Sequence, residues 1–140
     1  MAEPANLLKN VLGLIGGFII GATINMGLIL LGPHFIPPPE GMDQTTPEGL
    51  KAGFHLLESK HFVFPLLAHA LGTLAGAFIC ARIAATLKRE LALVIGFIFL
   101  SGGISMVDSY GGPLWFKIID LGFAYIPMAI VGWSLAQRRQ

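Results

Sequence analysis

The chain contains an uncharged stretch, residues 10–39, that is long enough to cross a lipid bilayer. Its apolar body, residues 11–31, meets the requirement of roughly 20 residues for a helix that spans a hydrocarbon core about 30 Å thick. Two more apolar runs cover residues 62–81 and 91–107, and a fourth follows a Gly-Gly-Pro turn at residues 111–113. Because these runs lack the alternation of barrel strands, and because backbone groups in hydrocarbon must bond internally, we expect transmembrane helices.

The predicted fold class is an all-α membrane protein, a four-transmembrane-helix bundle that forms a single integral membrane domain over residues 1–140. The four helices are predicted at residues 8–32, 62–87, 91–108 and 113–136, and the long outer loop at 33–61. Only 12% of the residues are charged, against about 25% in an ordinary soluble domain. The net charge of +1 and the placement of Lys and Arg at segment ends exclude a nucleic-acid-binding surface. The lipid bilayer is therefore the predicted partner.

The Lys and Arg residues near the helix ends predict the orientation, because positively charged loops stay in the cytoplasm. Six basic residues fall on one side of the predicted bundle: Lys9, Arg82, Lys88, Arg89, Arg138 and Arg139. On the other side, the 33–61 loop carries Lys51 and Lys60 against four acidic residues. We therefore expect both termini to be cytoplasmic and the 33–61 loop to be extracytoplasmic.

The outer loop also contains a pattern that is typical of a short amphipathic helix. Thr45 and Glu48 have the spacing of a capping box at a helix start. The apolar residues that follow share one helical face, and they are Leu50, Phe54 and Leu57. We expect a surface helix over residues 47–57 that turns this face toward lipid or toward the bundle.

Small residues recur at every fourth position in the first two predicted helices. They are Gly13, Gly17 and Gly21 in the first helix and Ala68, Gly72 and Gly76 in the second. This spacing lets helix backbones approach closely. The two faces either pack against each other within one subunit or make contacts between subunits. A homo-oligomer or a place in a larger membrane complex is therefore predicted.

Two prolines, Pro65 and Pro127, fall inside the second and fourth predicted helices and are expected to bend them. Such breaks serve binding or gating in some transporters, but prolines are also common in ordinary membrane helices.

Polar side chains inside the predicted spans are the candidate functional residues. They are Asn25, His69, Ser105, Asp120 and Tyr125. Asn25, His69 and Asp120 each lie about seven residues from the outer end of their helix, roughly 10 Å deep. Ionisable groups inside a membrane are costly, so they are candidates for function by default. The structural alternative is that Asn25 and His69 bond between helices, and that Asp120 pairs with Lys117.

The remaining histidines, His34, His55 and His61, are all on the outer side, where a metal could bind. No two histidines are three or four residues apart, so we predict no metal site, and no cofactor is clearly implied.

Recognised catalytic patterns are missing from the sequence, which argues against an enzyme. Three function classes remain open. The first is translocation of an ion, a proton or a small solute through an oligomer that uses the outer polar cluster. The second is an accessory subunit of a larger membrane complex, and the third is an enzyme acting on a lipid or quinone. Translocation predicts a solvated path below His69, whereas an enzyme predicts a lipid-sized groove beside His69 and Asp120.

Overall fold

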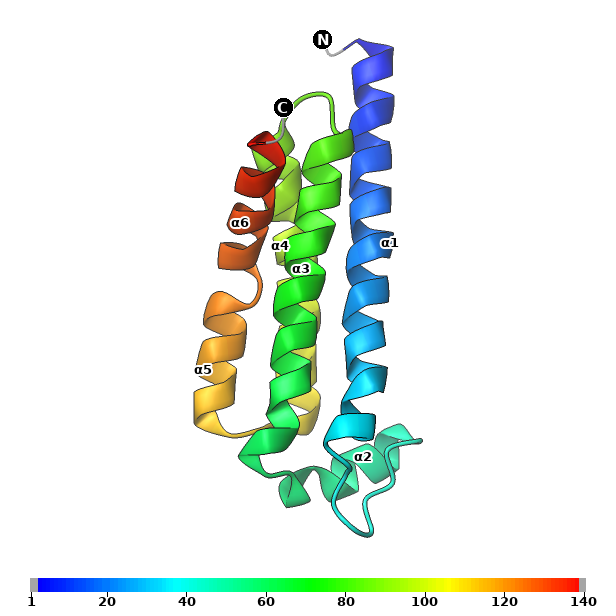
Figure 1. Cartoon of the computed structure of the whole chain (residues 1–140), viewed down its shortest axis with the longest axis vertical. Helices are drawn as coiled ribbons and strands as arrows, with labels where there is room; N and C mark the ends of the chain where they lie inside the picture. Colours follow the sequence, from blue (N-terminus) through cyan, green and yellow to red (C-terminus); the bar gives the residue numbers. More distant parts are fainter. Residues whose placement is uncertain (1–2, 139–140) are drawn as a thin grey trace.

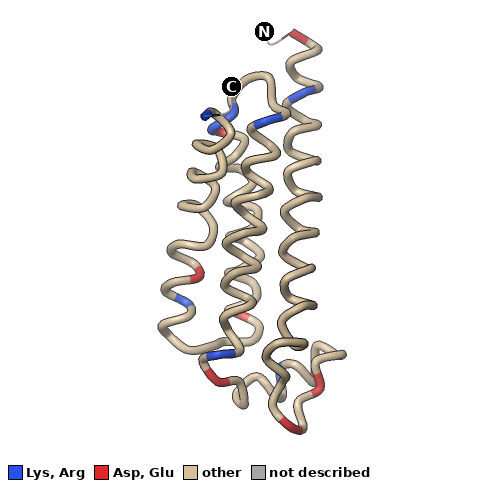
Figure 2. Tube along the Cα trace, viewed as in Figure 1, with Lys and Arg blue, Asp and Glu red and all other residues tan. Residues whose placement is uncertain are grey.

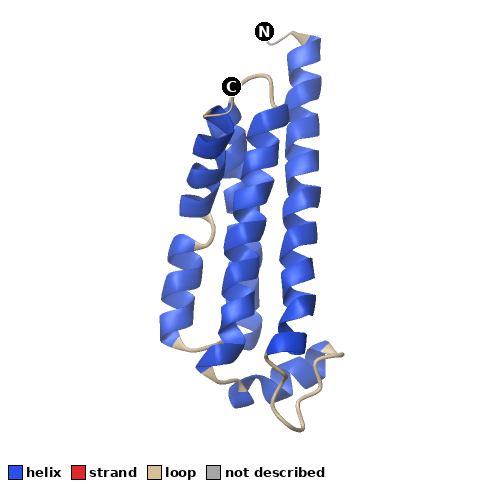
Figure 3. Ribbon diagram, in the orientation of Figure 1, coloured by secondary structure: helices blue, strands red, loops and turns tan. Residues whose placement is uncertain are grey.

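A computed structural model describes residues 3–138, and all regular structure in that part of the chain is helical (Figures 1 and 3). The α-helices are α1 (Pro4–Phe35), α2 (Pro47–Gly53), α3 (Val63–Ile83), α4 (Lys88–Tyr110), α5 (Leu114–Phe123) and α6 (Ile126–Gln137). Two short 3-10 helices, η1 (Phe54–Leu56) and η2 (Ser59–Phe62), precede α3. The long helices run side by side as a bundle, and α2 lies across one end of it (Figure 1).

Four segments are long and apolar enough to cross a membrane, which confirms the predicted fold class. They are Pro4–Phe35, Ser59–Ile83, Lys88–Tyr110 and Leu114–Gln137. Large apolar side chains remain exposed along their outer faces, as expected for helices whose solvent is lipid. The protein is therefore an integral membrane protein.

The helix ends differ from the predicted ones by up to four residues. The first helix begins at Pro4 instead of residue 8, α4 begins at Lys88 instead of residue 91, and two further differences change the loops. The first helix continues to Phe35, so Pro33 lies inside its last turn and the 33–61 loop begins later than predicted. The helix α3 ends at Ile83 instead of continuing to 87, because the chain turns at residues 84–87 and Leu87 adopts a left-handed conformation with φ 51°.

The fourth span is broken instead of gently bent. Helix α5 ends at Phe123 and α6 begins at Ile126, with Tyr125 between them at φ −115° and ψ −80°. Pro127 lies in the first turn of α6 and lacks the amide that would bond to the α5 side of the break. Pro65, by contrast, lies in the first turn of α3, where proline is tolerated without a bend.

The small-residue faces of α1 and α3 pack against each other within the chain. A Cβ added at Gly21 would lie 2.7 Å from the Gly72 carbonyl oxygen, and one added at Gly76 would lie 2.8 Å from the Gly17 carbonyl oxygen. Both faces are thus occupied inside one subunit. These faces are therefore not free to make the contacts between subunits that the sequence also allowed.

The two ends of the bundle differ in charge. Lys and Arg gather at the end where the first and last described residues lie, which we call the terminal end (Figure 2). The opposite end, the loop end, carries α2 and most of the acidic residues (Figure 2).

The buried side chain of Asn10 fixes the turn between α3 and α4 at the terminal end. Its Oδ1 accepts hydrogen bonds from the amides of Ala85 (3.0 Å) and Thr86 (3.1 Å). Its Nδ2 donates to Thr86 Oγ1 at 2.8 Å. One α1 side chain therefore satisfies the polar groups of a turn far away in the sequence.

A short helix forms in the loop as predicted, but its N-cap residue and its length differ from the prediction. The N-cap is Thr46, whose hydroxyl accepts a hydrogen bond from the Gly49 amide at 3.0 Å, in place of the predicted capping box at Thr45 and Glu48. Asp43 holds this start in place by accepting from the Thr45 amide at 2.8 Å and from the Thr45 hydroxyl at 2.6 Å. The α-helix ends at Gly53 and continues only as the 3-10 turn η1.

Candidate functional site

Two ionisable residues from different helices meet inside the loop-end half of the bundle. His69 Nδ1 on α3 lies 2.7 Å from Asp120 Oδ1 on α5. The Asp120 side chain is only 1% exposed and the His69 side chain 15% exposed. Lys117, the partner that helical spacing offered to Asp120, makes no ion pair with it among the described residues. Asp120 therefore bonds to a neighbouring helix and not to its own.

The break in the fourth span completes this site. Tyr125 lies at the break, and its hydroxyl donates to Asp120 Oδ2 at 3.1 Å. The Tyr125 ring also stacks on the His69 ring, with 5.6 Å between ring centroids. Gly103 of α4 leaves room for the Tyr125 side chain, because a Cβ at residue 103 would collide with the Tyr125 hydroxyl. The three residues form one hydrogen-bonded group.

The direction of these bonds defines what the group can do chemically. A tyrosine hydroxyl donates to a carboxylate, so Asp120 acts as acceptor through both oxygens. His69 then carries its proton on Nδ1, and Nε2 is left without a hydrogen bond to any described residue. A carboxylate that orients an imidazole in this way leaves Nε2 free to form a hydrogen bond with another molecule.

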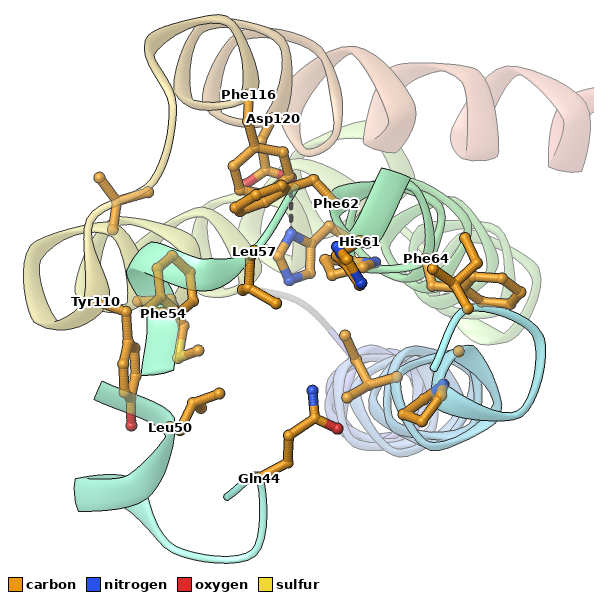
Figure 4. Close-up of a pocket in the computed structure, with 18 of the residues that line it drawn as sticks. Gln44, Leu50, Phe54, Leu57, His61, Phe62, Phe64, Tyr110, Phe116 and Asp120 are labelled. Atoms are coloured by element: carbon orange, nitrogen blue, oxygen red, sulfur yellow. Dashed lines mark hydrogen bonds and ion pairs between the residues drawn. The ribbon is translucent and has the colours of Figure 1, made fainter. Parts of the chain in front are cut away.

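A pocket of about 300 Å³ lies beside this group and includes His69 and Asp120 in its lining. Its walls are apolar and come from α1, α3, α4, α5 and the loop. Phe54 and Leu57 project into it from the loop, and Phe62 and Phe116 close the side near Asp120 (Figure 4). The predicted apolar face of the loop thus turns toward the bundle and forms one wall of the pocket.

Polar groups also line this apolar pocket. His69 and Asp120 form the buried end. Gln44, which is exposed, reaches toward the pocket from the loop, and the half-buried His61 lines the pocket beside Phe62 (Figure 4). His61 is fixed there by a contact of 3.1 Å between its Nε2 and the Pro37 carbonyl oxygen. The pocket therefore suits a molecule that is mostly apolar and has a hydrogen-bonding group at one end.

The structure separates the other two predicted residues from this group. Ser105 is exposed on α4, and its hydroxyl donates to the Ser101 carbonyl oxygen at 3.0 Å, within its own helix. Asn25 faces α3 at Gly72, and its buried Oδ1 has no hydrogen-bond partner among the described residues. Of the five predicted residues, the structure therefore brings together His69, Asp120 and Tyr125. It places Asn25 and Ser105 elsewhere in the bundle.

The three loop-end histidines, His34, His55 and His61, do not come together as a metal centre. His34 Nδ1 lies 3.3 Å from the Leu30 carbonyl oxygen of its own helix. His61 Nδ1 accepts from the Glu58 amide at 3.0 Å. Among residues 3–138, no group of three or more His, Cys, Asp or Glu side chains is placed to hold a metal ion.

Sequence reasoning missed Gln44 as a pocket residue and Thr73 as a buried polar one. Gln44 lies in an irregular part of the loop that has no periodic signal. Thr73 is fully buried on α3, four residues after His69, and this helical spacing was the available signal.

No protein-family model matches the chain, and neither the curated proteins nor the solved structures contain a significant match to it. The function must therefore be inferred from the site itself.

Proposed function

We propose that this membrane protein binds an uncharged lipophilic molecule in the loop-end pocket, and that His69 forms a hydrogen bond with the polar head of that molecule. The observation that carries the proposal is a buried His69–Asp120 pair at the end of an otherwise apolar pocket. Ionisable side chains inside a membrane protein are expensive to bury, and they mark ligand or proton sites. Apolar pockets with a few convergent polar groups are the usual form of small-molecule sites.

The chemistry of His69 Nε2 narrows the class of head group. A neutral imidazole accepts a hydrogen bond from a hydroxyl, and a protonated one donates to a carbonyl. The Asp120 carboxylate balances the charge of a protonated His69, so the pair offers no net positive charge to a negatively charged head. The head group is therefore a hydroxyl or a carbonyl, as in a quinol, a quinone or a long-chain alcohol.

The size of the pocket agrees with a head group and not with a whole lipid. Its volume of about 300 Å³ lies at the lower end of the range of small-molecule sites, roughly 300 to 1,000 Å³. A longer apolar tail would have to continue beyond the pocket into the surrounding bilayer. We therefore propose that the ligand enters from the membrane.

The packing beyond His69 favours binding over free passage of an ion. Toward the terminal end, Ala77, Ile95 and Ala129 are completely buried and form the closely packed core. An ion needs polar partners or water along its whole path. Translocation through this arrangement would require the core to open.

We further propose that the loop end faces the extracytoplasmic side. The support is the excess of Lys and Arg at the terminal end (Figure 2), which is the end expected to stay in the cytoplasm. The ligand then binds in the outer leaflet.

Quenching of Trp115 fluorescence provides a direct binding test. The Trp115 ring lies 6.1 Å from the ring of the pocket residue Phe62, and a Trp133→Phe background removes the other tryptophan. In this background, a short-chain quinone titrated into protein in nanodiscs should quench Trp115 saturably. His69→Gln should weaken the apparent affinity at least about tenfold, which is the loss of about 1.4 kcal/mol.

The matched control is Ser105→Ala, which removes a polar group of the same half of the bundle that lies outside the pocket. It should bind like the parent protein. Quenching that stays linear with quinone concentration, or that is the same in the His69→Gln protein, would refute the proposal for this head group. A long-chain alcohol that competes with the quinone would extend the result to the hydroxyl class.

A further inference from the structure

Two buried polar atoms deeper in the bundle have no partner in the protein. Among the described residues, Asn25 Oδ1 on α1 and Thr73 Oγ1 on α3 are the buried side-chain oxygen or nitrogen atoms without a hydrogen bond. Thr73 is completely buried. A polar group that is buried without a partner is costly, so native proteins satisfy such groups with protein or with bound water.

Thr73 could have satisfied its hydroxyl within its own helix, and it does not. Threonine in a helix commonly donates to the carbonyl four residues earlier. Thr23 on α1 does this, with its hydroxyl 2.8 Å from the Ile19 carbonyl oxygen. The Thr73 hydroxyl makes no such bond to the His69 carbonyl. Its rotamer therefore leaves the hydroxyl free for another group.

Asn25 packs against α3 at the residue that precedes Thr73. A Cβ added at Gly72 would be 2.9 Å from the Asn25 Cβ, so α1 presses directly on α3 at the residue before Thr73. Thr73 also follows His69 by four residues on α3, which places it on the same face, about one turn deeper. The polar side of α3 therefore extends beyond the buried end of the pocket.

We propose that Asn25 and Thr73 bind a water molecule between α1 and α3. Buried waters typically make two to four hydrogen bonds to otherwise unsatisfied polar groups. Asn25 Oδ1 accepts from the water, and the Thr73 hydroxyl donates to it or accepts from it. Two neutral oxygens are too few for a bare cation, which takes six or more oxygen ligands as Ca²⁺ or Mg²⁺.

This water site lies one turn deeper than His69, on the same helix. It extends the polar group of His69, Asp120 and Tyr125 toward the middle of the membrane. The inference does not depend on the proposed ligand, because the unpartnered atoms belong to the protein without a ligand.

A double-mutant cycle on Thr73→Val and Asn25→Leu tests the site in the absence of any ligand. Both replacements keep the shape of the side chain and remove its hydrogen-bonding atoms. If a water bridges the two residues, each single replacement leaves the water short of a partner and should increase the unfolding equilibrium constant about tenfold. The double variant should increase the unfolding equilibrium constant by much less than the product of the two single effects, because no polar atom is then left that needs the water.

The opposite sign is expected if no water is present. Removing a hydroxyl that is truly unpaired should then stabilise the protein, and the two replacements should act independently. That outcome would overturn the proposal. Thr23→Val is the matched control, because Thr23 is exposed and bonded within its own helix; it should change the constant less than about twofold.

Infrared spectroscopy provides a second readout that needs no unfolding. An internal water gives an O–H stretching band that shifts in H₂¹⁸O, and this band should be lost in Asn25→Leu and kept in Thr73→Ser. If Thr73→Val fails to fold, the spectra of Asn25→Leu and Thr73→Ser still show whether the water is bound. A spectrum without an isotope-sensitive band in the unaltered protein would refute the water site and leave the pocket proposal intact.

Discussion

Replacing Gly17 by Ala should separate α1 from α3 and destabilise the bundle. A Cβ at residue 17 would lie 2.5 Å from the Gly76 carbonyl oxygen and 2.8 Å from the Cys80 Cβ. Ordinary contacts begin at 3.4 Å, so the two helices would have to move apart by about 0.9 Å, and a gap of that size forfeits roughly a quarter to a half of each contact energy along the interface.

The size of the effect follows from the neighbours that Gly17 meets. Overpacking a well-packed core costs about 1 to 3 kcal/mol, and the upper value applies because neither a backbone carbonyl nor a Cβ can rotate away. Ala is favoured over Gly in a helix by about 1 kcal/mol. The net loss in the free energy of unfolding should therefore be about 2 kcal/mol.

Gly27→Ala on the same helix is the matched control. No atom lies within 4 Å of a Cβ added at Gly27, so this variant keeps only the gain in helix propensity. The two variants should then differ by about 3 kcal/mol, or about a hundredfold in the unfolding equilibrium constant. Equilibrium unfolding in mixed detergent micelles, followed by circular dichroism, measures both. Equal stabilities for the two variants would show that α1 and α3 are not in this close contact.

Three further outcomes are expected. Asn10→Leu should lower the free energy of unfolding by about 2 kcal/mol, because two turn amides lose their acceptor; unchanged unfolding would contradict the role of Asn10 in this turn. Phe54→Asp should speed proteolysis of the loop and weaken quinone binding, since Phe54 stacks on Tyr110 at 5.7 Å and lines the pocket; an unaltered cleavage rate would mean that the loop does not cover the pocket. Hydrogen bonds from Thr45, and then from Thr46, lower the pKa of Asp43 below its ordinary value of 3.8, so its bonds should stabilise the loop start above that pH and be lost as the pH falls through the lower pKa. The Thr45 amide signal in NMR should titrate with that low midpoint, and Asp43→Asn should abolish the titration.

Hydropathy and spacing were sufficient for the architecture, because the bilayer imposes a length on every span and a cost on every charge. Three spans could be predicted from the uncharged stretches between charged residues, and the fourth from its apolar residues after the Gly-Gly-Pro turn at 111–113. The four-residue repeat of Gly13, Gly17 and Gly21 identified the packing face of α1, but whether that face meets α3 or another subunit depended on the tertiary structure.

The candidate site shows the same division. Depth along each helix singled out Asn25, His69 and Asp120, since depth is a property of sequence position. Contact also depends on how each helix is rotated, and rotation is set by the neighbours that a helix packs against. Only the tertiary structure, with α5 beside α3 and the fourth span broken at Tyr125, brought Asp120 to His69 and turned Asn25 onto Gly72. The pocket depended on it as well, because the loop residues that form one wall are far in sequence from the helices that they cover.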